Sequence, residues 1–77
     1  MNLASQESTA EIILAPHKFL NLSLKSGGII LHLKKTDGIE LTYALDNEGA
    51  FFNEAIDQFK SYRIFAAVDS AFELILS

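Results

Sequence analysis

The stretch from Ile29 to Leu45 reads IILHLKKTDGIELTYAL, two alternating apolar runs joined by Thr36-Asp37-Gly38. Alternation with a period of two predicts two half-buried strands, and the turn residues between them predict an antiparallel hairpin. Both strands must place their apolar residues on the same face, and this requirement selects the length of the loop. A two-residue loop would set Leu33 opposite Thr42, whereas a three-residue loop sets Leu33 opposite Leu41.

The three-residue loop brings every cross-strand pair into agreement, since apolar residues meet apolar ones and polar residues meet polar ones. The pairs are Leu33 with Leu41, Leu31 with Tyr43, Ile29 with Leu45, Lys34 with Glu40 and His32 with Thr42. The loop chemistry fits a type I turn followed by Gly38 in the left-handed region. We therefore predict a hairpin with the loop Thr36–Gly38.

The residues before this hairpin predict a further strand. Lys18–Lys25 alternates, with Leu20, Leu22 and Leu24 on one face, and Ser26-Gly27-Gly28 supplies a turn. This pattern predicts a three-stranded antiparallel meander with one continuous apolar face. Residues 10–15 have two interpretations: a short helix opened by a capping box at residues 8–11, or a fourth strand, which is slightly favoured. Pro16 ends either one.

The C-terminal third predicts helices. Phe51, Phe52, Ala55, Ile56 and Phe59 form a stripe at helical spacing, which predicts a helix over Asn47–Ser61 on the apolar face of the meander. Residues 63–77 also fit a helix with one narrow polar stripe. A hairpin turning at Asp69-Ser70 is disfavoured because it pairs Ala66 with Glu73.

Together these patterns predict an α+β fold. The expected architecture is a three-stranded, or with residues 10–15 four-stranded, antiparallel β-meander packed on one face by one or two C-terminal helices. Residues 1–77 form a single small domain in this interpretation, and residues 1–9 are flexible. The apolar stripe changes sides near Tyr62, so the C-terminal helix has more apolar surface than one small sheet needs.

This surplus apolar surface predicts self-association, because exposing it to water is unfavourable. The expected partner is a second copy of the chain, in a homodimer, with another protein as the alternative. The residues expected at the contact are Ile64, Phe65, Val68, Phe72, Ile75 and Leu76.

The composition limits the class of protein. The chain has 77 residues, 49% of them hydrophobic, no cysteine and a net charge of −4. A chain of this length forms a marginally stable monomer. No apolar run has the length of a membrane span, and residues 1–9 lack the pattern of a signal peptide. We expect a small acidic protein of the cytoplasm that does not associate with membranes.

No pattern of catalytic, cofactor-binding or metal-ligating residues stands out. His17 and His32 lack the further ligands that a metal site requires. No serine lies in a G-x-S-x-G setting, and the loop Ser26–Gly28 joins two strands rather than a strand and a helix. Glu54 and Asp57 share a solvated helix face in the predicted fold. We expect a chain that is not an enzyme and has no cofactor.

The remaining function class is a small protein-binding or regulatory module, expected to be homodimeric. The alternative is a nucleic-acid-binding module that uses the outer face of the predicted sheet. That face would carry Phe19, Lys25, His32 and Lys34, which could stack on bases and contact phosphates. The acidic character of the whole chain makes nucleic acid the weaker expectation.

Overall fold

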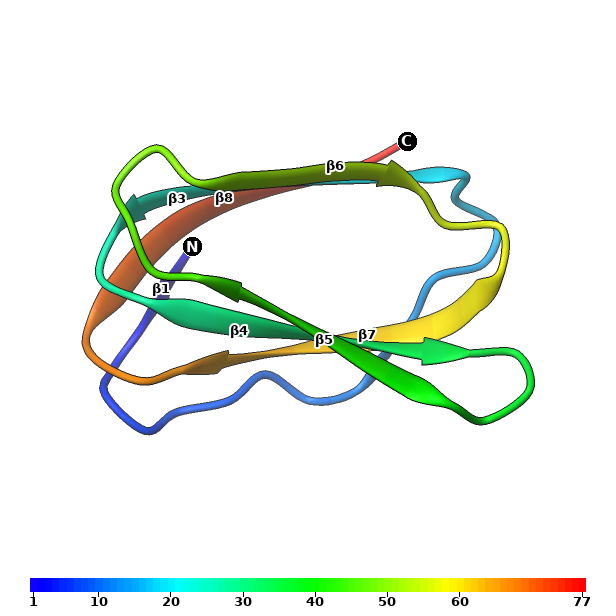
Figure 1. Ribbon diagram of the computed structural model, residues 1–77, viewed down its shortest axis with the longest axis horizontal. Coiled ribbons are helices and arrows are strands. Elements are labelled where there is room, and N and C mark those ends of the chain that lie inside the picture. The colour runs from blue at the N-terminus through cyan, green and yellow to red at the C-terminus, as the bar shows by residue number, and fades with distance from the viewer.

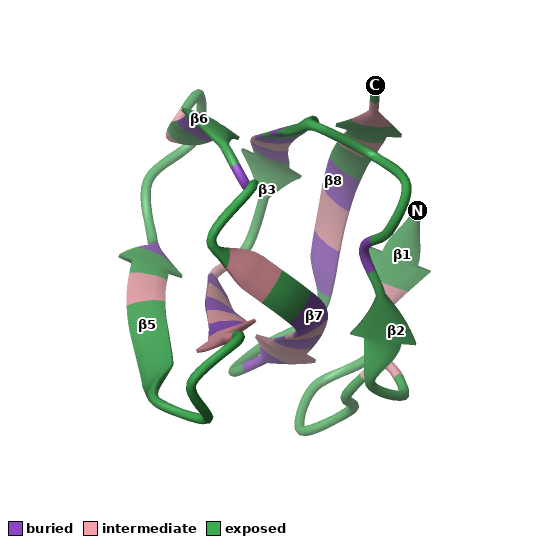
Figure 2. Cartoon of the chain, turned by 90° about the vertical axis from the view of Figure 1, so that its right-hand side faces the viewer, coloured by how far each residue is buried: buried purple, intermediate pink, exposed green.

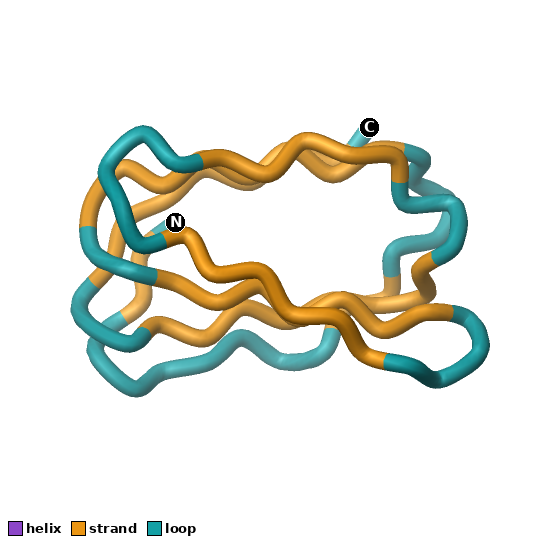
Figure 3. The backbone as a smooth tube through the Cα atoms, in the orientation of Figure 1, coloured by secondary structure: helices purple, strands orange, loops and turns teal.

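The computed structural model describes residues 1–77, which form eight β-strands and no helix (Figures 1 and 3). The strands are β1 (Asn2–Leu3), β2 (Ile12–Ile13), β3 (Phe19–Ser26), β4 (Ile29–Lys35), β5 (Glu40–Leu45), β6 (Phe51–Ala55), β7 (Phe59–Ala66) and β8 (Ser70–Leu76). They form two four-stranded antiparallel sheets, sheet A in the order β1-β8-β3-β6 and sheet B in the order β2-β7-β4-β5. The predicted α+β class is therefore wrong, and the chain is all-β.

The β4–β5 hairpin has the predicted register. Ile29 lies opposite Leu45, Leu33 opposite Leu41, and the intervening pairs follow the prediction. The Lys35 N–H donates to the Ile39 carbonyl at 2.7 Å, which closes the loop over Thr36–Gly38. Gly38 has φ +94°, the left-handed conformation that this loop requires. The local part of the sequence analysis is confirmed here.

The predicted meander of three strands is wrong, because β3 and β4 lie in different sheets. The chain passes from sheet A to sheet B at Gly27, which has φ +90°. A Cβ at this position would collide with the Oγ of Ser70 and the carbonyl oxygen of Asp69. The Ser70 hydroxyl accepts a hydrogen bond from the Gly28 N–H at 3.0 Å, so the two crossings between the sheets support each other.

The hydrophobic core lies between the two sheets. The leucines of β3 and the inward side chains of β4 face one another across it, instead of lying side by side in one sheet. Fourteen buried residues form the core: Leu14, Leu20, Leu22, Leu24, Ile29, Leu31, Leu33, Leu45, Phe52, Ile56, Tyr62, Ile64, Ala66 and Phe72. Aliphatic side chains make up most of this set, so the inside of the sandwich is a packed core.

The predicted helix over Asn47–Ser61 is a turn followed by β6 and the start of β7. Phe52 faces inward opposite Leu22, while Phe51 faces outward and is 72% exposed. A run of five apolar residues among ten fits either a helix or a strand, and pairing with β3 decides for the strand.

The predicted helix over residues 63–77 is also wrong, since this segment forms the second half of β7 and all of β8. The hairpin was disfavoured because Ala66 would pair with Glu73. That objection does not apply, because β7 pairs with β4 in sheet B and β8 pairs with β3 in sheet A. Leu31 lies opposite Ile64, and Leu24 lies opposite Phe72.

The N-terminal segment runs along one side of the sandwich. β1 pairs with β8 and β2 pairs with β7, so residues 1–14 contribute an edge strand to each sheet. Between them, the Gln6 and Thr9 N–H groups donate to carbonyls of β7 at 2.8 Å. Residues 1–9, which the sequence analysis expected to be flexible, are thus hydrogen-bonded to β7 and β8. Residues 12–13 form the strand that the extended interpretation predicts.

The strand order of the two sheets is that of a jelly roll.

Candidate interaction surfaces

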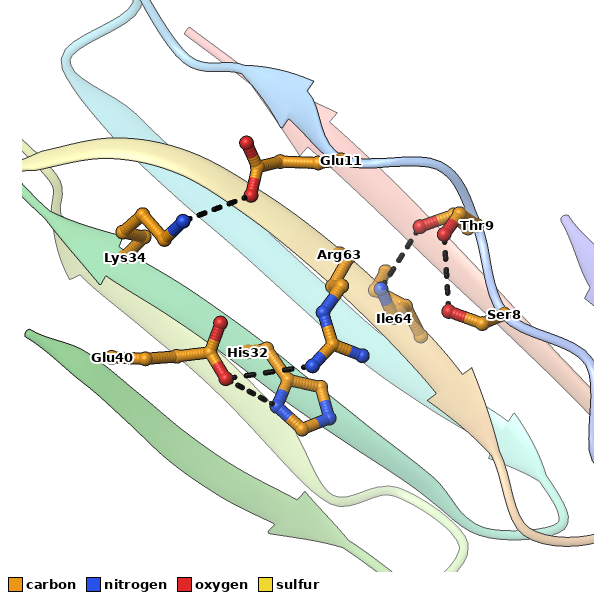
Figure 4. A network of polar contacts seen from close by, with 8 residues as sticks. All are labelled: Ser8, Thr9, Glu11, His32, Lys34, Glu40, Arg63 and Ile64. Atoms are coloured by element: carbon orange, nitrogen blue, oxygen red, sulfur yellow. Dashed lines mark hydrogen bonds and ion pairs between the residues drawn. The ribbon is translucent and has the colours of Figure 1, made fainter. Parts of the chain in front are cut away.

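The outer face of sheet B carries a network of charged side chains (Figure 4). Oε1 of Glu40 on β5 lies 3.3 Å from Nδ1 of His32 on β4 and 3.5 Å from Nη2 of Arg63 on β7. Nζ of Lys34 lies 3.5 Å from Oε1 of Glu11 in the N-terminal segment. Ion pairs between such partly exposed side chains contribute about 1 kcal/mol or less. They link neighbouring strands and leave this face with its charges largely paired.

The histidine in this network has a modest role. Its Nδ1 is buried and makes no hydrogen bond of good geometry, so its contact with Glu40 is an ion pair only when the imidazole is protonated. No group of three or more histidine, aspartate or glutamate side chains comes together in a geometry that could hold a metal ion. His17 makes no contact in this network and lines a hollow at one end of the sandwich.

That end hollow has a volume of about 360 Å³ and is lined by the loop after β2 and the turns that follow β4 and β6. Its charged side chains are of mixed sign: Lys18 and Lys60 on one hand, Asp57 on the other. It is open to solvent, and no fixed array of donors or acceptors is directed into it. We assign no chemistry to it.

The outer face of sheet A differs from that of sheet B in having no ion pair. We call it the sheet A face and define it by the outward side chains of three adjacent strands. These are Phe19, Asn21 and Ser23 on β3, Phe51, Asn53 and Ala55 on β6, and Glu73 and Ile75 on β8. Glu73 is charged, and Lys25, in the same outward phase of β3, lies at the end of this face, where it lines a hollow together with Glu48 and Phe51.

Three large apolar side chains of the sheet A face are open to solvent. Phe19 is 51% exposed, Phe51 72% and Ile75 52%. Asn21 lies between them, opposite Asn53 on one side and Ile75 on the other. An apolar patch on a sheet, with neutral amides between its large side chains, is typical of a protein contact surface.

The structure separates the residues predicted for self-association. Ile64 and Phe72 are buried in the core, and Leu76 faces inward against it. Phe65 lies on the outer face of sheet B, where Ser8 bridges to it, and Val68 is exposed in the turn between β7 and β8. Only Ile75 belongs to the sheet A face.

The structure also separates the four residues predicted for nucleic-acid binding into two pairs. Phe19 and Lys25 belong to β3 in sheet A, while His32 and Lys34 belong to β4 in sheet B. Their side chains therefore lie on opposite outer faces of the sandwich, and Lys34 is paired with Glu11. The structure does not form the single basic and aromatic surface that this alternative required.

Phe51, Asn21 and Asn53 were not among the predicted site residues. Strand alternation carries a signal for them, because Phe51, Asn53 and Ala55 occupy one phase of β6 and Phe52 the other. Helical spacing fitted the same five phenylalanine, alanine and isoleucine residues, so this signal was not decisive in the sequence.

Comparison with known proteins identifies the fold. No protein-family model and no curated protein matches the sequence. Solved structures of CENP-C from Drosophila melanogaster do match. The chain superposes on CENP-C bound to CAL1 with a TM-score of 0.78 at 15% sequence identity, covering 99% of this chain and 61% of that chain. It superposes on the CENP-C cupin domain with a TM-score of 0.75 at 19% identity, covering 99% of this chain and 56% of that chain.

The chain has a cupin fold. At identities of 15% and 19% the likeness concerns the fold alone, and the chain spans about three fifths of the length of these CENP-C chains. The jelly-roll order of the two sheets is the common feature of cupins. In this cupin sandwich the interior is filled by the core side chains, so the surfaces that remain for binding are external.

Proposed function

We propose that this chain is a non-enzymatic protein-binding domain that forms a homodimer through the sheet A face. The observation that supports the proposal is the solvent exposure of Phe19, Phe51 and Ile75 on one outer sheet surface. Burying such side chains against a partner removes apolar area from water, which is the main favourable term in association.

The chemistry of the sheet A face favours a second copy as the occupant. The chain has a net charge of −4, so two copies repel each other over most of their surfaces. At the centre of the sheet A face the polar groups are the amides of Asn21 and Asn53, which both donate and accept hydrogen bonds. Groups near the axis of a two-fold contact meet their own copies, and amides satisfy that arrangement whereas like charges do not.

One of the CENP-C structures with this fold is bound to CAL1, which supports a binding role for a cupin sandwich. The proposal for this chain is therefore a binding domain, with self-association as its specific form. The surface differs from the one expected from sequence, because the helix that was to supply it is absent.

The test measures the mass of the protein in solution. Sedimentation velocity of the unmodified chain at micromolar concentration is expected to show a dimer, and the substitutions Phe51→Ser and Asn21→Asp are expected to give monomers. Ile39→Ser is the matched control, because Ile39 is 56% exposed but lies in the turn between β4 and β5, away from the sheet A face. A monomeric unmodified chain, or a dimer that survives Phe51→Ser and Asn21→Asp, contradicts the proposal.

A further inference from the structure

The two open sides of the sandwich are treated differently by the chain. On one side, the N-terminal segment lies along β8 and β7 through β1 and β2. On the other side, β5 ends sheet B and β6 ends sheet A, and each is paired with one neighbour only. Figure 2 shows β1 and β2 together on one side of the molecule and β5 and β6 on the other.

The backbone of β5 presents unpaired groups to solvent. The bond from the Lys35 N–H to the Ile39 carbonyl sets the phase of the ladder, so Leu41, Tyr43 and Leu45 bond to β4. The N–H and C=O groups of the alternate residues, Glu40, Thr42 and Ala44, point away from β4. A strand edge of this kind is a template for pairing with another extended chain.

Apolar side chains lie next to this edge. A hollow of about 220 Å³ separates β5 from β6, and its apolar lining includes Leu41, Tyr43, Phe52 and Phe59. Leu41 belongs to the inward phase of β5, opposite Leu33, yet it is 37% exposed and lines the hollow. The rings of Tyr43 and Phe52, whose centroids lie 4.8 Å apart, both line the hollow.

The segment that forms this side of the molecule is strongly acidic. Residues 36–59, which include β5 and β6, contain six acidic and no basic side chains, so they carry a charge of −6 while the rest of the chain carries +2. Two cations reach this side from neighbouring strands: Lys35 lines the hollow, and Arg63 contacts Glu40. Glu54 also lines the hollow and has no ion-pair partner.

We propose that β5 binds an extended basic segment of a partner protein as an additional strand of sheet B. This inference rests on the proposed function of the chain as a protein-binding domain and names a second surface for it. Alternate apolar side chains of the segment enter the hollow beside Leu41 and Tyr43. The intervening side chains are cationic and lie beside Glu40, within the field of the acidic segment.

The β6 edge is the less suitable template. Its unpaired backbone groups belong to Phe51, Asn53 and Ala55, whose side chains form part of the sheet A face. Its inward phase carries Glu54, and an inward-pointing charge on an edge strand disfavours the addition of another strand. The β5 edge has no charged residue in its inward phase.

The test uses a fluorescein-labelled synthetic peptide of alternating valine and lysine as the probe, and fluorescence anisotropy as the readout. Thr42→Pro removes an N–H that points to solvent, so it blocks strand addition while leaving the β4–β5 ladder intact. We expect Thr42→Pro to weaken binding of the peptide about tenfold or more. Asn53→Pro makes the same change on the β6 edge and is the matched control. It is expected to leave the affinity for the peptide unchanged, while its effect on the sheet A face is measured separately by sedimentation velocity.

A second pair of variants keeps the test valid if Thr42→Pro does not fold. Thr42 is exposed, so Thr42→Lys and Thr42→Glu are expected to fold, with Thr42→Lys weakening and Thr42→Glu strengthening binding of the basic peptide. A peptide of alternating valine and glutamate is expected not to bind. The proposal is overturned if the basic peptide does not bind the unmodified chain, if both peptides bind equally, or if Asn53→Pro abolishes binding and Thr42→Pro does not.

The dimer through the sheet A face and the binding of a basic segment at the β5 edge can be refuted independently of each other. Phe51→Ser is expected to abolish the dimer and to leave peptide binding unchanged, whereas Thr42→Lys is expected to weaken peptide binding and to leave the dimer unchanged. If Thr42→Pro or Thr42→Lys dissociates the dimer instead, a second copy occupies the β5 edge, and both the basic segment and the sheet A contact are refuted.

Discussion

Gly27 is the glycine whose surroundings leave no room for a side chain, and replacing it tests the crossing between the sheets. Gly27→Ala adds a Cβ that collides with Ser70 and Asp69 in a backbone with φ +90°. We expect a loss of about 2 kcal/mol or more in the free energy of unfolding, because overpacking adds to the backbone strain. Urea unfolding followed by circular dichroism measures the loss.

Gly38→Ala is the matched control for this prediction. Gly38 has φ +94°, but a Cβ there meets no atom within 4 Å. Its substitution is therefore expected to cost only the backbone strain, about 1 kcal/mol. Equal losses for the two variants would show that the contact between Gly27 and the turn before β8 does not contribute.

Tyr62 is expected to make the free energy of unfolding depend on pH in the alkaline range. Burial raises the pKa of its phenol above the usual value of 10.0. Below pH 10 the phenol is protonated in both states, so its contribution is constant. Above pH 10 the unfolded chain loses the proton first, and the free energy of unfolding falls as the pH rises towards the higher folded pKa. Tyr62→Phe is expected to remove this part of the pH dependence in denaturation series between pH 8 and 11, approximate limits chosen to bracket the usual tyrosine pKa.

The same substitution at Tyr43 controls for the loss of a hydroxyl group. Tyr43 is only half-buried, and its ring contact with Phe52 is kept by phenylalanine. An alkaline stability profile of Tyr62→Phe that matches the unmodified chain would contradict the assignment to Tyr62.

At the scale of an element, the N-terminal segment is expected to contribute to stability. Deleting residues 1–9 removes the bonds between Met1 and Phe72, between Gln6 and Ala66 and between Thr9 and Ile64. Each backbone bond contributes on the order of 1 kcal/mol, so the deletion is expected to lower the free energy of unfolding by several kcal/mol. Ser5→Ala, which removes only an exposed contact to the Ala67 carbonyl, is the control. A deletion variant as stable as the full chain would show that the segment is dispensable.

The elements differ in how well their sequences predicted them. The β4–β5 hairpin is local, so its register followed from alternation and from the loop Thr36–Gly38. β6 and β8 have no such local partner, since each pairs with β3 across at least 25 residues of chain. Phe51, Phe52 and Ile56 fit helical spacing as well as strand alternation, and long-range pairing decided between them.

At the scale of the whole molecule, the two proposed surfaces are separate. The sheet A face is a side-chain surface on the outside of one sheet, and the β5 edge is a backbone surface on the open side of the other. A dimer through the first leaves the second free, so a homodimer presents two copies of the acidic edge. Two linked sites of this kind bind a partner with repeated basic segments more tightly than one site does.

The sequence by itself determined the β4–β5 hairpin and the apolar faces of the strands that became β3 and β4. Leu20, Leu22 and Leu24 were assigned correctly to an apolar face, as were Ile29, Leu31 and Leu33. Only the tertiary structure decided that these two sets face each other across a core, instead of lying side by side. The physical reason is that burial satisfies an inward leucine equally in either arrangement. Backbone pairing between strands far apart in the chain selects the sheet, and that choice separated Phe19 and Lys25 from His32 and Lys34.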